Sequence, residues 1–247
     1  MKSTEEWYDA LAVRVESTVL PGGNRALVVE PSGVDDTGPA PGVLWLHWLG
    51  HVRNDCSQFL PEAVALAGRG VVSVLPQGTF PWSRRPSASA EDAVEVAAEL
   101  ERVRGALDHL RHLPGVDPLR TAIVGHDYGA MYALALRDAD ARVVVAATPD
   151  SSWPHWFLTY WTNPEDRADG CREALERFDP LAAAAVLGDR LVLQWAEDDS
   201  YVPGHAPPMY AHAAPASRAV HYPYDHQLGD AAVVDRLEVL RHALDLV

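Results

Sequence analysis

One short stretch of the sequence, residues 121–131, combines a reactive side chain with the glycines of a tight turn. A β-branched run at 121–124 stops at Gly125, and Asp127 and Gly129 follow at alternate positions. In a G-x-nucleophile-x-G pattern, a strand turns directly into a helix, and the strained central residue exposes its side chain. Glycine is needed on either side because a larger residue would strike the neighbouring backbone. The pattern predicts either a carboxylate nucleophile or an elbow that has lost its chemistry.

A nucleophile at such an elbow needs a base and a group that orients the base. His226 follows the last predicted strand, and Asp199 follows the strand before it. The order of nucleophile, acid and histidine along the chain is the one expected for this kind of elbow. Residues 199–203 also match a D-x-x-V-P acid loop, which favours Asp199 over the alternative, Asp150. Because the carboxyl ends of parallel strands meet at one edge of a sheet, we expect these groups to converge there.

The elements that would position these side chains alternate along the chain. Apolar and β-branched runs predict strands at 11–16, 25–30, 42–46, 71–75, 121–124, 142–147, 191–195 and 219–222. Helical spacing predicts helices at 57–69, 91–112, 128–138, 206–214 and 229–246. The first two strands are joined by a turn and form an antiparallel start. The rest predicts an α/β fold, with a mostly parallel sheet of about eight strands covered by helices on both faces.

We expect a single domain over residues 1–247, since 247 residues with 48% hydrophobic content can build one sizeable core. Residues 151–180 are dense in aromatic side chains and have no strand pattern, so they predict a short lid inserted between two strands.

The formal charge of −15 disfavours nucleic acid and anionic membranes as partners and favours a small neutral or weakly polar molecule. Cys56 and Cys171 form no disulfide framework and no metal spacing, so no metal or cofactor is expected. The first residues lack the apolar core of a signal peptide, which predicts a cytoplasmic location. The oligomeric state is left open, a homodimer included.

The motifs of this chain resemble those of the α/β-hydrolase superfamily. Its short length and small insertion are similar to the dienelactone hydrolase branch of that superfamily. The resemblance is carried by Leu-His-Trp-Leu-Gly at 46–50, Gly-His-Asp-Tyr-Gly at 125–129, Asp-Ser-Tyr-Val-Pro at 199–203, and His226. The Gly-His-Asp core resembles that of epoxide hydrolases and of haloalkane and fluoroacetate dehalogenases. The resemblance implies that Asp127 is the nucleophile, His226 the base and Asp199 the partner of the base.

The chain also departs from each of these relatives. The dienelactone branch carries cysteine or serine at the elbow rather than aspartate. Haloalkane dehalogenases have tryptophan where this chain has Tyr128. The arginines of fluoroacetate dehalogenases are replaced by Tyr128 and Met131.

An aspartate nucleophile favours attack on an sp³ carbon, because attack on an ester would give only a mixed anhydride. We therefore expect an epoxide, or less strongly a carbon–halogen bond, to be opened through an aspartyl alkyl ester. His226 would activate the water that hydrolyses this ester. The backbone N–H groups of Leu49 and Tyr128 are the expected oxyanion donors.

The substrate contacts are predicted from aromatic residues. Tyr160 is the candidate acid for an epoxide oxygen, or else it only packs the lid. Trp48, Trp82 and Trp156 could offer indole N–H groups to a halide. The alternative functions are an ester or lactone hydrolase with Asp127 as general base, a biosynthetic isomerase or cyclase, and a binding protein. Arg84 and Arg85 are expected to be solvated or to meet an anionic substrate.

Overall fold

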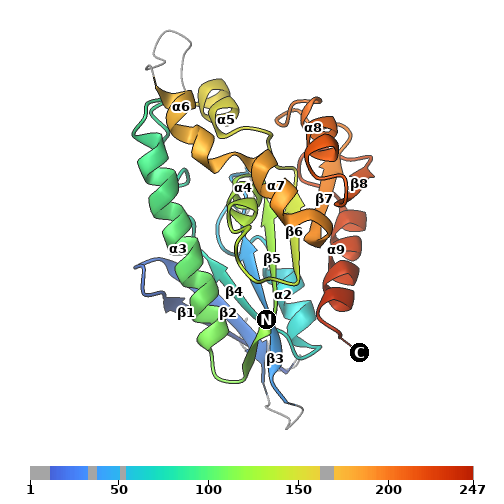
Figure 1. The fold of residues 1–247 in the computed structure, drawn as a ribbon. Helices are drawn as coiled ribbons and strands as arrows, with labels where there is room; N and C mark the ends of the chain where they lie inside the picture. Colours follow the sequence, from blue (N-terminus) through green and yellow to red (C-terminus); the bar gives the residue numbers. More distant parts are fainter. Residues whose placement is uncertain (1–11, 33–37, 51–53, 162–169, 247) are drawn as a thin grey trace, which may run out of the picture.

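A single sheet of eight strands runs through the computed structural model, which describes residues 12–32, 38–50, 54–161 and 170–246 (Figure 1). The strands are β1 (Val13–Val19), β2 (Arg25–Pro31), β3 (Ala40–Leu46), β4 (Val72–Pro76), β5 (Val116–His126), β6 (Val143–Ala147), β7 (Leu191–Ala196) and β8 (Arg218–Tyr222). Their order in the sheet is β1-β2-β4-β3-β5-β6-β7-β8. The pairs β1–β2 and β2–β4 are antiparallel, and all the others are parallel. The predicted α/β class and the mostly parallel sheet are confirmed.

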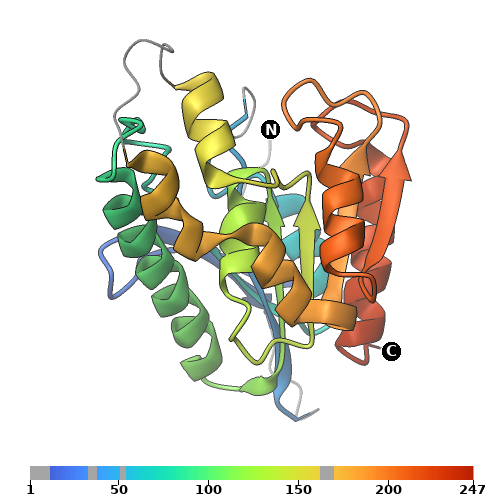
Figure 2. The ribbon, with the colours of Figure 1, turned by 45° about the horizontal axis from the view of Figure 1, so that its top comes forward.

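Helices cover both faces of the sheet (Figure 2). They are α2 (Leu60–Ala67), α3 (Asp92–His112), α4 (Tyr128–Ala135), α5 (Trp153–Tyr160), α6 (Cys171–Leu175), α7 (Pro180–Leu187), α8 (Ala206–Ala213) and α9 (Asp230–Ala243), with short 3-10 turns η2 (Glu176–Phe178) and η3 (Gly188–Arg190). One core cluster joins the sheet to α3, α4, α7 and α8, and a second joins the opposite face to α2 and α9.

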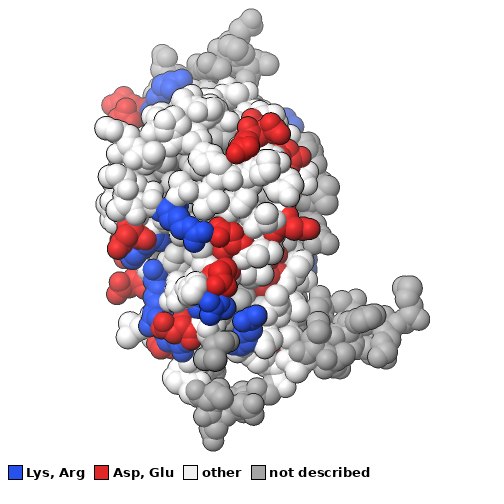
Figure 3. Space-filling view, turned by 90° about the vertical axis from the view of Figure 1, so that its right-hand side faces the viewer, with Lys and Arg blue, Asp and Glu red and all other residues white. Residues whose placement is uncertain are grey.

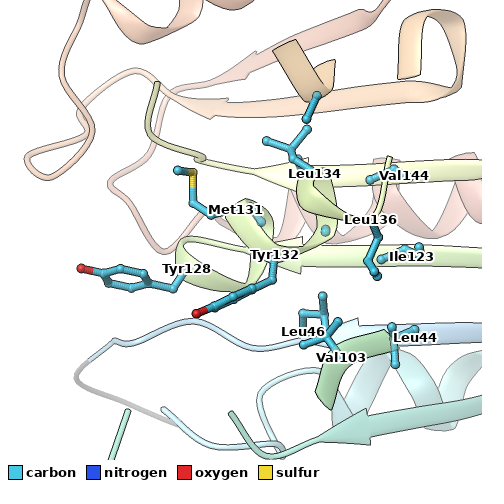
Figure 4. Packing of buried hydrophobic residues seen from close by; sticks show 14 of the residues in the cluster. Leu44, Leu46, Val103, Ile123, Tyr128, Met131, Tyr132, Leu134, Leu136 and Val144 are labelled. Carbon is cyan, nitrogen blue, oxygen red and sulfur yellow. The ribbon is translucent and has the colours of Figure 1, made fainter. Parts of the chain in front are cut away.

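The central strands supply both clusters by simple alternation. In β5, Ile123 belongs to the first cluster, whereas Ala122 and Val124 belong to the second. Successive side chains of a strand point to opposite faces, so a strand covered on both sides must be apolar throughout. Figure 4 shows the first cluster, in which the aliphatic side chains of α4 lie against those of β3, β5 and β6. This double burial fixes β5 and hence the position of the turn that follows it.

Several elements differ from the sequence prediction, among them β5, α5 and α7. The strand β5 begins at Val116, whereas only 121–124 was predicted, because Val116 pairs with Ala40 and regular pairing resumes at Thr121. The interruption contains Pro118, which has no N–H for a ladder hydrogen bond.

The helix α7 was not predicted at all. Its start carries a recognisable signal, since Asp179 accepts a hydrogen bond from the Leu181 N–H and Pro180 fills the first turn. Of the segment expected to form a lid, residues 162–169 lie outside the described residues.

Candidate active site

Asp127 occupies the turn between β5 and α4 with φ 58° and ψ −121°, a strained conformation for a residue with a side chain. The two glycines allow this turn. A Cβ atom at Gly125 would lie 2.2 Å from the carbonyl oxygen of Gly129, and one at Gly129 would lie 2.0 Å from that of Leu46. The backbone at both positions therefore excludes any larger residue, and α4 starts directly against β3.

Asp127, His226 and Asp199 come together at the carboxyl edge of the sheet, after β5, β8 and β7. The Nδ1 atom of His226 lies 2.8 Å and 3.0 Å from the two carboxylate oxygens of Asp199. Its Nε2 atom lies 3.7 Å from Oδ1 of Asp127. Asp199 is itself held by the backbone N–H groups of Tyr201 and Val202, which donate to its Oδ1 at 2.8 and 2.9 Å.

The charges of this cluster depend on one another. Burial alone would lower the pKa of His226, but its contacts with the Asp127 and Asp199 carboxylates, reinforced by their negative charges, raise it to about 9. Burial works against ionisation of Asp199, yet the hydrogen bond and charge of His226 and the two backbone donors keep the pKa of Asp199 below its usual value. At neutral pH His226 is therefore an imidazolium between two carboxylates.

Asp150, the alternative orienting acid, serves a different histidine. Its Oδ2 lies 2.5 Å from Nδ1 of His155, and its Oδ1 accepts from the Ser152 N–H at 3.2 Å. Complete burial raises the pKa of Asp150, while the His155 hydrogen bond opposes that shift. Within the described parts of the chain, Asp199 is thus the carboxylate that contacts His226 at Nδ1.

The two expected oxyanion donors lie beside the elbow. The Leu49 N–H donates a 2.9 Å hydrogen bond to Oδ2 of Asp127. The Tyr128 N–H stands at the first position of α4, where helix N–H groups have no intrahelical acceptor. One oxygen of Asp127 is therefore held by the Leu49 N–H, and the other faces His226.

A set of residues that the sequence did not single out supports this geometry. His126 Nε2–H donates to the backbone carbonyl of His226 at 2.8 Å, and its Nδ1 accepts from the Gln58 amide at 2.8 Å. The same Gln58 accepts from the Trp48 N–H at 2.7 Å. Burial lowers the pKa of His126 well below the usual value, so its ring is neutral, as this pattern of one donor and one acceptor requires. His126 and Gln58 thus link the elbow and the loop after β3 to the backbone of His226.

A cavity of about 390 Å³ opens above the Asp127 carboxylate. The loop after β3, the elbow, the end of α5 and the loops after β7 and β8 line it with Trp48, Leu49, Gly50, Asp127, Tyr128, Trp156, Tyr160, Trp161, Ser200, Tyr201, Asp225, His226 and Gln227. Figure 4 shows the Tyr128 side chain leaving the first turn of α4, away from the aliphatic core.

The predicted substrate contacts separate into two groups. Trp48, Trp156 and Tyr160 line this cavity, whereas Trp82 does not: its indole N–H donates to the Trp48 carbonyl at 2.8 Å. The Trp156 indole N–H is closed off from solvent and has no partner among the described residues. Tyr160 is 44% exposed and donates its hydroxyl to the Tyr201 carbonyl at 2.5 Å.

Neither Arg84 nor Arg85 lines the cavity. Arg84 pairs with Glu95, and the Arg85 guanidinium lies 5.7 Å from the centre of the Trp161 ring. In the described ranges, no group of three or more histidine, cysteine, aspartate or glutamate residues is arranged to hold a metal ion. None of the helices that the structure describes has the length and apolar character needed to cross a membrane.

Comparisons with solved structures place the fold. A protein of Klebsiella pneumoniae subsp. pneumoniae assigned as a dienelactone hydrolase is 16% identical, with a TM-score of 0.66 over 95% of this chain and 99% of that one. A thermophilic esterase of Thermogutta terrifontis is 17% identical, with a TM-score of 0.62 over 94% and 92% of the two chains. The acylaminoacyl peptidase of Pyrococcus horikoshii is 14% identical, with a TM-score of 0.69 over 99% of this chain. This chain spans only 43% of that peptidase.

The similar structures are thus a dienelactone hydrolase-like protein and other esterases and peptidases of the α/β-hydrolase fold. At these low identities the similarity establishes the fold, and this chain has the α/β-hydrolase fold. No protein-family model and no curated protein matches the sequence.

Proposed function

We propose that this chain is a hydrolase in which the Asp127 carboxylate attacks an sp³ carbon, with an epoxide favoured over a carbon–halogen bond. The product of that step is an alkyl ester of Asp127, which His226 and a water molecule then hydrolyse. The observation that carries the proposal is the 2.9 Å hydrogen bond from the Leu49 N–H to Oδ2 of Asp127.

This hydrogen bond gives the two oxygens of Asp127 different roles. Oδ2 is held by Leu49, and Oδ1 faces His226 and is free to form the bond to carbon. When water later adds to the ester carbonyl, the negative charge develops on Oδ2, where Leu49 already donates. The N–H group that would otherwise hold the carbonyl oxygen of an ester substrate is occupied by the aspartate itself.

The charge of His226 fits the same two-step order. In the free enzyme the carboxylates of Asp127 and Asp199 hold the pKa of His226 at about 9, so its ring is a poor base at neutral pH. Alkylation removes the negative charge of Asp127 and one of the two interactions that raise this pKa. His226 then loses its proton more readily and can accept one from the attacking water.

Opening an epoxide requires a proton for the departing oxygen, and Tyr128 is the better-placed donor than Tyr160. The Tyr128 hydroxyl accepts a 2.7 Å hydrogen bond from the Trp161 indole N–H, and its own proton has no acceptor among the described residues. Burial and the nearby Asp127 charge raise the pKa of Tyr128 well above its usual value, so it is protonated. The proton of Tyr160, in contrast, is already donated to the Tyr201 carbonyl.

The atoms balance over the cycle. The electron pair of the broken carbon–oxygen bond passes to the epoxide oxygen, which takes the Tyr128 proton as Asp127 Oδ1 bonds to carbon. The Tyr128 phenolate then takes back a proton, through solvent, from the His226 imidazolium, which leaves His226 neutral. Water gives one proton to His226 and its oxygen to Asp127. Collapse of the adduct releases the diol alkoxide, which takes that proton from His226. The proton of the newly formed Asp127 carboxylic acid passes to His226 and restores the imidazolium.

A second candidate is an ester or lactone hydrolase in which Asp127 acts as a general base on water. The names of the similar structures support it, since they include a dienelactone hydrolase-like protein and an esterase. The comparisons with solved structures support this candidate better than the alkyl-ester route. The contacts of Asp127 support the alkyl-ester route.

A single turnover in H₂¹⁸O separates the two candidates. Enzyme in excess over an epoxide or alkyl halide is quenched and digested, and the peptide that contains Asp127 is weighed. An alkyl-ester intermediate leaves ¹⁸O in the Asp127 carboxylate, whereas the general-base route leaves none there. His226→Gln should accumulate the ester as a mass increase on the same peptide. An active enzyme without label in Asp127 would refute the alkyl-ester route.

A further inference from the structure

Aromatic rings surround most of the cavity above Asp127. On the side of β7 and β8, the His226 ring lies 6.2 Å from the Trp48 ring and 5.1 Å from the Tyr201 ring. Tyr201 in turn lies 6.0 Å from Tyr160, at the end of α5. Tyr160 and Tyr201 are 44% and 40% exposed, so this pair forms the outer rim of the cavity.

The wall continues on the side of α5. Trp161 donates its indole N–H to the Tyr128 hydroxyl, and the Tyr128 ring lies 4.4 Å from that of Trp156. Outside the cavity lining, Trp82 lies 6.3 Å from Tyr128 and is hydrogen-bonded to the Trp48 carbonyl. The rings therefore follow one another around the cavity, with Asp127 below them.

The charged groups of the described lining are two carboxylates and the His226 imidazolium. Asp127 and Asp225 line the cavity, and its described lining contains no lysine or arginine. The positive charge of His226 is matched by Asp127 and Asp199 on either side of it. Burial raises the pKa values of Tyr128 and Tyr160, and the charges of Asp127 and Asp150 raise both further. A negative charge entering the cavity would therefore meet repulsion.

On the outer surface near β8 and α9, charged side chains are paired differently from those of the cavity. In Figure 3, basic and acidic side chains lie side by side on this part of the molecule. Arg218 pairs with Asp235, and Arg241 pairs with Glu238. Charges on that face largely cancel in pairs, whereas the carboxylates of the cavity have only His226 as a counter-ion within its described lining.

We propose that the cavity selects a substrate that carries a cationic amine, a tertiary or quaternary ammonium group, held against its aromatic rings. Cations bind to the faces of tryptophan and tyrosine rings, most strongly where water is excluded. Trp161 already has the guanidinium of Arg85 on its ring, from a residue outside the cavity lining. The same wall excludes carboxylate substrates. The inference rests on the proposed function only in taking this cavity as the place where the substrate binds.

Three unreactive compounds of nearly the same shape test this selection. Choline carries a trimethylammonium group, 3,3-dimethyl-1-butanol carries a neutral tert-butyl group in its place, and 3,3-dimethylbutanoate is an anion. Their dissociation constants for the full chain are measured by isothermal titration calorimetry at neutral pH and low salt. We expect choline to bind about tenfold more tightly than the neutral alcohol, and the anion to bind most weakly. Choline that fails to bind, or binds no more tightly than the alcohol, overturns the proposal.

Substitutions of the two rim tyrosines test whether the preference for choline arises in this cavity. Tyr201→Leu and Tyr160→Leu should each reduce the preference for choline to about threefold or less, because each removes one ring. Tyr224→Leu is the matched control, since Tyr224 is also 40% exposed but lies outside the cavity lining. An equal loss in all three variants, with folding checked by circular dichroism, would overturn the assignment to this cavity. These measurements involve no bond-breaking, so their result is independent of the ¹⁸O experiment.

Discussion

The backbone N–H of Leu49 lies 2.9 Å from Oδ2 of Asp127, a residue 78 positions further along the chain. The contact exists because β3 and β5 are neighbours in parallel register, with Leu46 opposite Gly125. The loop after β3 and the turn after β5 therefore emerge side by side. This contact orients the carboxylate so that one oxygen is held and the other faces His226.

The identity of the orienting acid can be tested without a substrate. Asp199→Asn should lower the pKa of His226, because a carboxylate that accepts from its Nδ1–H is replaced by a neutral amide. Asp150→Asn is the matched control, and should leave that pKa nearly unchanged, since Asp150 contacts His155. The His226 ring protons, followed by NMR from pH 5 to 10, give both values. A larger change in the Asp150 variant would reverse the assignment.

The raised pKa of His226 makes the stability of the fold depend on pH. Its pKa is about 9 in the folded protein against 6.5 for the unperturbed side chain, so between these values the folded state binds more protons than the unfolded one. The His226 contribution is complete below pH 6.5 and is lost as pH rises through 9. Urea unfolding should therefore give a falling free energy of unfolding from pH 6.5 to 9. His226→Gln should show a flatter profile; identical profiles for the two proteins would contradict the raised pKa.

Tyr128→Phe removes the proposed proton donor and keeps the ring. For an epoxide, formation of the Asp127 ester should slow by roughly 10²–10⁴-fold. For an alkyl bromide, whose leaving group needs no proton, the slowing should be much smaller. Stopped-flow or quenched-flow measurement of ester formation gives both rates. Tyr160→Phe is the comparison variant, and if it proved the more damaging for the epoxide, the role would return to Tyr160.

Gly129→Ala should destabilise the protein by about 3 kcal/mol or more, because the new Cβ would lie 2.0 Å from the carbonyl oxygen of Leu46. Gly105→Ala is the matched control within α3, where a Cβ would have no neighbour within 4 Å. It should instead stabilise the protein by about 0.5–1 kcal/mol. Chemical denaturation of the two variants measures both effects. A tolerated alanine at 129 would mean that α4 can shift away from β3.

Sequence patterns predicted the strands well where burial on both faces demanded an unbroken apolar run, as in β4 and β6. They missed the start of β5, where Pro118 interrupts the pairing, and they missed α7. Prediction works when a local pattern and tertiary packing agree, and it weakens where neighbouring strands decide the boundary.

The sequence by itself determined the α/β fold class and identified Asp127, Asp199 and His226 as candidates, since each depends on a local motif or on a place after a strand. Only the tertiary structure decided that Asp199 rather than Asp150 contacts His226, and that Trp82 lies outside the cavity. It also linked Gln58 and His126 to the position of His226. The reason is physical: hydrogen-bond partners lie within about 3 Å of each other in space, and chain position does not encode that distance.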